Sequence, residues 1–166
     1  VLSEIAVLFP EIFVVVSAIA LLMFGVFTGN RMTTAITSAA AVVLAATCYL
    51  LILNLPESRL EFMNMFVHDQ FSTLGKFLVV LAALMTLVIA MPWLAREEHK
   101  RFEFPVLFLL AVFGMMLMVS ANDLLSLYLG IETSSLSLYV LASFARDDVK
   151  STEAGLKYFV LSSLAS

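Results

Sequence analysis

Long apolar stretches alternate with short polar connections along almost the whole chain. A helix that crosses a bilayer needs about 20 mostly apolar residues, because the hydrocarbon core is about 30 Å thick and an α-helix rises about 1.5 Å per residue. The pattern therefore predicts an all-α, polytopic integral membrane protein, a bundle with about five complete transmembrane helices plus the start of a sixth. The predicted spans are residues 5–27, 33–55, 74–95, 104–121 and 124–144, and the sixth begins at residue 151.

The last predicted helix is short. Nine residues, 158–166, follow Lys157, too few to complete a span. A helix that ended within lipid would leave backbone carbonyls without partners. We therefore expect the sequence to be part of a longer protein. The first apolar stretch lacks a basic leading segment and is longer than a signal-peptide core, so we expect it to be a retained helix.

The connections carry most of the polar residues. The longest, residues 56–73, alternates apolar and polar positions, which favours a surface hairpin or an interfacial segment. Asp123, with Asn122 as an alternative, is expected to cap the helix that follows. His68 and Asp69 are adjacent in the long connection, and solvent exposure explains them better than catalysis.

Basic residues predict the orientation in the membrane. Six of them follow the first, third and fifth spans, whereas Arg59 and Lys76 are assigned to the opposite side. Because cytoplasmic loops carry an excess of Lys and Arg, the first group is expected in the cytoplasm and the N-terminus outside. The first group is Arg31, Arg96, Lys100, Arg101, Arg146 and Lys150.

Composition excludes several classes of function. Of the 166 residues, 62% are hydrophobic and 13% are charged, whereas a soluble domain has about 45–50% apolar and about 25% charged residues. The net charge of −4 does not suggest a nucleic-acid partner. One cysteine cannot form an intrachain disulfide, and two histidines do not suggest a metal cluster. The chain has no phosphate-binding loop, dinucleotide glycine pattern or nucleophile elbow.

Glu132 is the first candidate for chemistry. It follows Asp123 by nine positions, which places it about 14 Å into the fifth span, close to the membrane midplane. Intramembrane acids are costly and usually mark an ion or proton path. Tyr128, Ser135 and Tyr139 share one stripe of the helix with Glu132, because they are spaced by three or four residues. The alternative is a neutral, structural hydrogen bond between helices; serines and tyrosines alone are more often packing groups.

Lys157 is the second candidate. It lies about 9 Å into the sixth helix, slightly less deep than Glu132, so neighbouring antiparallel helices could bring the two within reach. Two alternatives remain open. Glu153 lies four residues earlier, the favourable order for a Glu–Lys pair on one helix. The long side chain could also extend to the membrane surface.

The second half of the chain resembles a known family. The segments "SANDLLSLYLGIE" and "STEAGLKYFVLSS" are close to the wording of subunit N of the proton-pumping NADH:quinone oxidoreductase, respiratory complex I. The resemblance is strong over residues 103–166 and looser before them, and it covers the whole chain. It implies an antiporter-like fold, with peripheral helices in residues 1–103 and the opening of a proton-channel repeat in residues 104–166.

The resemblance also implies roles. Glu132 matches the family's glutamate on the fifth helix, and Lys157 its lysine on the sixth, both in the proton path. The subunit is expected to hold no cofactor, since flavin and iron–sulfur clusters belong to partner subunits. The expected partners are the other membrane-arm subunits, the lipid bilayer and protons. The expected location is a bacterial inner membrane, with the mitochondrial inner membrane as the alternative.

Two other functions remain open at this point. A subunit of a multisubunit sodium/proton antiporter would share the fold without redox coupling. A structural scaffold would use the intramembrane charges only to hold helices together. Sodium dependence separates the first from a complex I subunit, and a neutral replacement of Glu132 tests the second.

Overall fold

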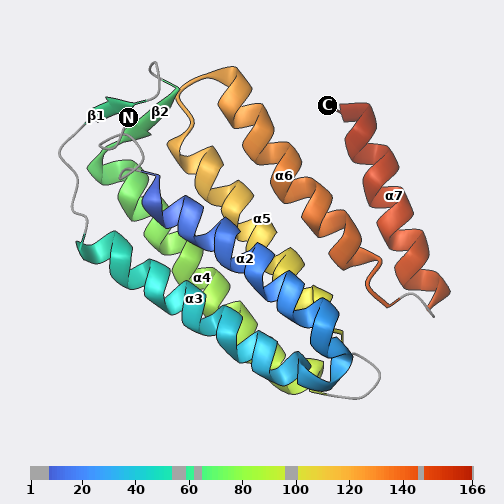
Figure 1. Ribbon diagram of the computed structural model, residues 1–166. Helices are drawn as coiled ribbons and strands as arrows, with labels where there is room; N and C mark the ends of the chain where they lie inside the picture. Colours follow the sequence, from blue (N-terminus) through green and yellow to red (C-terminus); the bar gives the residue numbers. More distant parts are fainter. Residues whose placement is uncertain (1–7, 54–58, 62–64, 96–100, 146–147, 166) are drawn as a thin grey trace.

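The computed structural model describes residues 8–53, 59–61, 65–95, 101–145 and 148–165. It shows a bundle of long helices lying side by side, with the last helix at one edge (Figure 1). The elements are α2 (Phe9–Thr28), η1 (Gly29–Met32), α3 (Thr33–Leu53), β1 (Arg59–Glu61), β2 (Phe66–His68), α4 (Gln70–Leu94), α5 (Glu103–Ser120), α6 (Leu124–Ala142) and α7 (Val149–Ala165).

The predicted membrane helices are confirmed. Four described runs are long and apolar enough to cross a membrane, and the first of them, Phe9–Leu53, has 45 residues and contains both α2 and α3. The chain reverses between these two helices at η1, where Gly29 adopts a φ of 64°. Residues with a side chain rarely adopt this backbone conformation, whereas glycine does so at little cost. The run therefore supplies two spans, and α4, α5 and α6 supply three more.

The apolar core lies between α2, α3, α4 and α5, and large apolar side chains also cover the outside of the bundle. Phe27 is 82% exposed and Ile89 is 78% exposed. Outward-facing apolar residues of this size fit a lipid surface, which does not penalise them as water does. Core residues include Val14, Ala18, Ala40, Leu44, Val80, Leu87, Leu109, Val112 and Met116.

The long connection forms a hairpin, as its alternation predicts. β1 and β2 pair antiparallel, with Arg59 opposite His68 and Glu61 opposite Phe66. The hairpin lies at the end of the bundle where α2, α4 and α6 begin (Figure 1). The backbone N–H of Asn122 donates to the carbonyl of Met65 at 2.8 Å, which ties the hairpin to the α5–α6 turn. This end is called the hairpin face below.

Two helices begin at aspartates. The Asp123 carboxylate accepts a hydrogen bond from the Ser126 N–H at 2.7 Å, which confirms the predicted cap of α6. Asp69 caps α4 in the same way, and Ser72 returns the contact by accepting from the Asp69 N–H. This capping box starts α4 at Gln70, four residues before the predicted start at residue 74. Asp69 is thus half-buried and structural, and not simply an exposed loop residue.

The same shift corrects the placement of Lys76. We counted this residue, near the predicted start of the third span at residue 74, among the exposed charges of the outer side, but the structure places it deeper in α4, fully buried. The early capping signal lengthens the helix at its N-terminal end, so Lys76 falls in its second turn. It therefore leaves the count of loop charges used to predict orientation.

α5 and α6 approach each other through glycines. A Cβ added at Gly114 would lie 2.5 Å from the backbone nitrogen of Ser134 and 2.9 Å from the carbonyl oxygen of Gly130. The buried face of α6 consists mainly of small residues, Ser126, Gly130, Ser134 and Ser137. Small residues let membrane helices pack backbone to backbone, where van der Waals contact is densest.

Replacing Gly114 by alanine is therefore expected to destabilise the α5–α6 pair. Alanine favours a helix by about 1 kcal/mol over glycine, but overpacking a close contact costs about 1–3 kcal/mol, and occasionally more. Backbone atoms cannot move aside, so we expect a net loss of about 2 kcal/mol. Thermal denaturation of the full-length protein measures it. Gly75→Ala is the matched control, since its Cβ would meet a Val119 methyl rather than backbone. Equal stabilities of the two variants would contradict the prediction.

Candidate functional site

A pocket of about 260 Å³ lies between α6 and α7, and Glu132 lines it. Tyr128 and Tyr139, from the predicted stripe of α6, line it as well, together with Phe159 and Ser163 of α7 and Leu136. Ser135 is half-buried and is not among the lining residues. The structure therefore gathers three of the four predicted stripe residues around one pocket.

Tyr139 makes the main polar and aromatic contact between the two helices. Its hydroxyl donates a hydrogen bond to the Ser162 hydroxyl. Its ring meets Tyr158 and Phe159 edge to face, with centroid separations of 4.7 Å and 5.8 Å. Gly155 lets α7 come close, because a Cβ there would lie 2.4 Å from the Ser143 side chain. These contacts position the pocket wall opposite Glu132.

Glu132 itself is half-buried at the pocket wall. Within the described chain no ion pair involves its carboxylate. The pocket offers it the hydroxyls of Tyr128 and Tyr139, on either side of it along α6, and of Ser163 from α7. A carboxylate in a pocket with hydroxyl groups can accept a proton from them or from water and release it again.

Lys157 lies on another side of α7. Its ammonium pairs with Glu153 at 2.5 Å, and 68% of the lysine side chain is exposed. Phe159, two positions later, faces the pocket; two positions correspond to about 200° around a helix, so Lys157 points away from it. The structure does not bring Lys157 to Glu132, and a role for Lys157 in a proton path stays a prediction.

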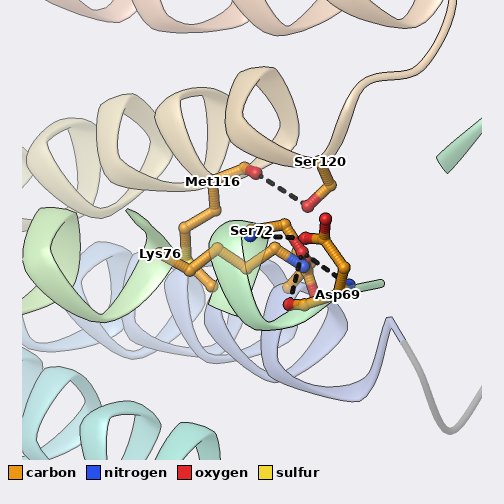
Figure 2. A network of polar contacts seen from close by, with 6 residues as sticks. Asp69, Ser72, Lys76, Met116 and Ser120 are labelled. Atoms are coloured by element: carbon orange, nitrogen blue, oxygen red, sulfur yellow. Dashed lines mark hydrogen bonds and ion pairs between the residues drawn. The ribbon is translucent and has the colours of Figure 1, made fainter. Parts of the chain in front are cut away.

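A second charged site was not singled out from the sequence. Glu11 of α2 and Lys76 of α4 form an ion pair at 2.5 Å, and each residue is 1% exposed. Figure 2 shows Lys76 beside Ser72 and Asp69, below Ser120 at the end of α5. The sequence held one signal for this site: Glu11 and Lys76 are each an isolated charge within an apolar run. Their sequence separation, 65 positions, hides the pairing.

Metal-ligating side chains do not gather in the part of the chain that the structure describes. No group of three or more His, Cys, Asp or Glu side chains is placed there to hold a metal ion. Cys48 is buried, inside α3. The carboxylates, hydroxyls and ammonium group described above are side chains that can bind and transfer protons.

The Asp69 cap predicts a pH dependence of stability. The backbone N–H of Ser72 holds the pKa of the Asp69 carboxyl below its ordinary value of 3.8. A lowered folded pKa means that the stabilisation is present above the unfolded pKa and is lost as the pH falls through the folded value. Asp69→Asn keeps an acceptor but cannot titrate, so its thermal stability should fall less below about pH 4 than that of the wild type. Parallel acid profiles would contradict this assignment.

Comparisons with known proteins agree with the predicted resemblance. Residues 121–166 match a family model described as NADH:quinone oxidoreductase/Mrp antiporter, transmembrane. Two curated relatives named NADH-quinone oxidoreductase subunit N, from Paramagnetospirillum magneticum and Rhodospirillum rubrum, are each 48% identical to the chain. Both alignments cover 95% of the chain, and 32% and 33% of the relatives' lengths.

A solved structure shows the same arrangement of helices. The chain matches a chain of respiratory complex I from Thermus thermophilus with a TM-score of 0.77 and 29% identity, over 94% of this chain and 33% of that one. The sequence thus spans about a third of the length of the relatives it matches. The family model, the relatives and the structure agree, and the chain belongs to the NADH-quinone oxidoreductase subunit N family.

Proposed function

We propose that this chain is part of a membrane-arm subunit that translocates protons, coupled to quinone reduction by NADH. The observation that carries the proposal is the position of Glu132. Its carboxylate lines a pocket with hydroxyl groups between α6 and α7, within the segment that matches the antiporter family model. An acid near the membrane midplane is costly, and such acids usually mark an ion pathway or a proton relay.

Glu132 would be the proton-binding group of this path. Tyr128 and Tyr139 line the same pocket and would relay protons or hold water around the carboxylate. Ser135, three positions after Glu132 on the same stripe of α6, does not line the pocket. It would support the proton path from beside the pocket. Hydroxyls both donate and accept hydrogen bonds, which is what a chain of proton transfers requires.

Lys157 would act on the other side of α7. Its ammonium is held by Glu153, and a change of partner would move a positive charge relative to the pocket. Such a movement alters how readily Glu132 holds its proton, because nearby charges favour or disfavour ionisation. Coupling by charge movement needs no cofactor in this subunit. The electron carriers, flavin and iron–sulfur clusters, would lie in partner subunits.

The remaining expectations follow from this assignment. Bacterial relatives suggest the inner membrane, with the other membrane-arm subunits and lipid as neighbours. With Lys76 removed from the loop count, Arg59 alone remains on the side opposite the six other basic residues. This charge bias supports an outward N-terminus, so the hairpin face would be the outer face.

The two-part organisation is also a proposal. Residues 1–103 would form the peripheral helices and residues 104–166 the opening of the channel repeat. The family model matches only from residue 121, and α5 packs against α2 and α4 as well as α6. We infer that α5 links the two parts and transmits movement between them.

Inverted membrane vesicles test the overall function. Deleting the gene for the full-length protein should abolish NADH-driven proton uptake and NADH oxidation by quinone. Restoring the gene should restore both activities. The description of the family model also names the Mrp antiporter. A sodium/proton antiporter, the alternative function, would show sodium-dependent proton exchange without NADH. NADH oxidation and uptake that persist without the protein, alongside a loss of sodium-dependent exchange, would replace our proposal with that function.

A further inference from the structure

The helices around the Glu11–Lys76 pair carry few other charges. Besides these two residues, the helices α2, α3 and α5 contain a single charged side chain, Glu103, in the first turn of α5. That turn lies at the opposite end of the bundle from the hairpin face (Figure 1). Outside the helices, His68 and Asp69 lie at the start of α4 and are the titratable groups nearest to Lys76 along the chain.

Packing alone explains this pair poorly. A buried ion pair is often no more stabilising than apolar side chains of the same volume. The pair nevertheless occupies a core formed by four apolar helices. Ionisable groups in such positions usually serve an ion or proton path. A role in binding or transfer therefore explains these residues better than a role in packing.

The pair also has spare capacity for hydrogen bonding. Oε1 of Glu11 contacts Lys76, while its Oε2 atom is buried and has no hydrogen-bond partner among the described residues. The hydroxyl of Thr73, one turn before Lys76, is also buried without a hydrogen-bond partner among the described residues. Buried polar atoms are nearly always paired, and those that are not often belong to functional sites. Glu11 Oε2 can therefore accept a proton or a hydrogen bond from water.

A polar side of α4 leads from this site to the hairpin face. Asp69, Ser72, Thr73 and Lys76 are spaced by three, one and three positions, which places them on one side of the helix. They extend from the N-cap over seven positions, about 10 Å along the axis. Figure 2 shows Asp69, Ser72 and Lys76 gathered there, facing the Ser120 end of α5.

We propose that the Glu11–Lys76 pair is a second proton-binding site, which exchanges protons with the hairpin face along this side of α4. On uptake, a protonated water on this side of α4 gives up its proton: its O–H bond breaks as an O–H bond forms at Glu11 Oε2. The negative charge of Glu11 is thereby neutralised, while Lys76 keeps its ammonium. On release, that O–H bond breaks and the proton returns to a hydroxyl or water on the same side of α4. The site lies on different helices from Glu132, and its proton exchange requires no turnover of the complex.

Infrared spectroscopy of the full-length protein in its assembled complex tests the proposal without NADH. We expect a carboxyl C=O band that titrates with pH in the wild type and disappears in Glu11→Gln. Asp148→Asn, which removes an exposed carboxylate at the start of α7, should retain this band. Identical titrations of Glu11→Gln and the wild type would overturn the proposal.

Two further variants distinguish a proton-binding role of the Glu11–Lys76 pair from a purely structural one. If Glu11→Gln fails to assemble, the double variant Glu11→Gln/Lys76→Met leaves no unpaired charge, and it too must lose the band. Thr73→Val removes the hydroxyl on the path and should slow the response of the band to a pH jump several-fold, with the same end point. An unchanged band in the double variant would show that Glu11 binds no proton, and an unchanged rate in Thr73→Val would exclude this path.

Discussion

Glu132→Gln in the full-length protein should lower NADH-driven proton uptake and NADH oxidation by quinone together, by roughly tenfold or more. A positioned proton-transfer group contributes at least on this order to a rate. Glutamine has the same shape as glutamate but cannot bind or release a proton at neutral pH. Because Glu132 is half-buried at a pocket wall, the substitution leaves the packing of α6 on α5 unchanged. The loss would therefore report on proton chemistry.

Inverted vesicles allow both rates to be recorded in one preparation, with assembly of the complex checked on native gels. Asp148→Asn is the matched control, because it also removes one carboxylate and lies outside the pocket. It should retain wild-type rates. If Glu132→Gln also retains both rates, the carboxylate is not needed as an ionisable group. Glu132 would then have only a structural role, as in the scaffold alternative.

Lys76→Met should destabilise the protein by about 3–5 kcal/mol, the usual cost of leaving one partner of a buried ion pair alone. The Glu11 carboxylate would remain in the apolar core with no cation beside it. The double variant Glu11→Leu/Lys76→Met should recover most of this loss, because apolar residues of similar volume replace a buried pair at little cost. Thermal denaturation of the wild type, both single variants and the double variant gives the coupling between the two positions.

This thermodynamic cycle has a clear contrary result. Additive losses, with the double variant less stable than either single one, would mean that the two side chains do not interact. The cycle is independent of the infrared test. A double variant that is stable and still loses the titrating carboxyl band would show that the pair binds protons and is not needed for folding.

The sequence alone was sufficient for the membrane helices. Each span was recognised from apolar length, since the thickness of a bilayer sets how many apolar residues a helix needs. Asp123 was recognised as a cap, and the alternation in residues 56–73 indicated a hairpin. Glu132 stood out because an acid is rare in such a helix. These features depend on neighbours in the sequence.

Tertiary structure decided which face of each helix points inward. Lipid-facing and core-facing positions are both apolar, so the hydrophobic pattern does not distinguish them. That the small-residue face of α6, which includes Gly130, is the one that packs inward was decided only by its contact with α5. The start of α4, by contrast, is set by the local capping box of Asp69 and Ser72, a signal that apolar length alone does not contain.

Pairing between distant residues was likewise beyond the sequence. Glu11 and Lys76 meet because α2 and α4 lie in one bundle, and no local pattern records that meeting. Lys157 was placed near Glu132 by depth alone, whereas the rotation of α7 points it away from the pocket and leaves it with Glu153, the local partner on the same helix. Apolar length and local caps are properties of adjacent residues and determine where helices lie along the chain. Rotation and partner choice come from contacts between helices, and these were decided only when the bundle packed.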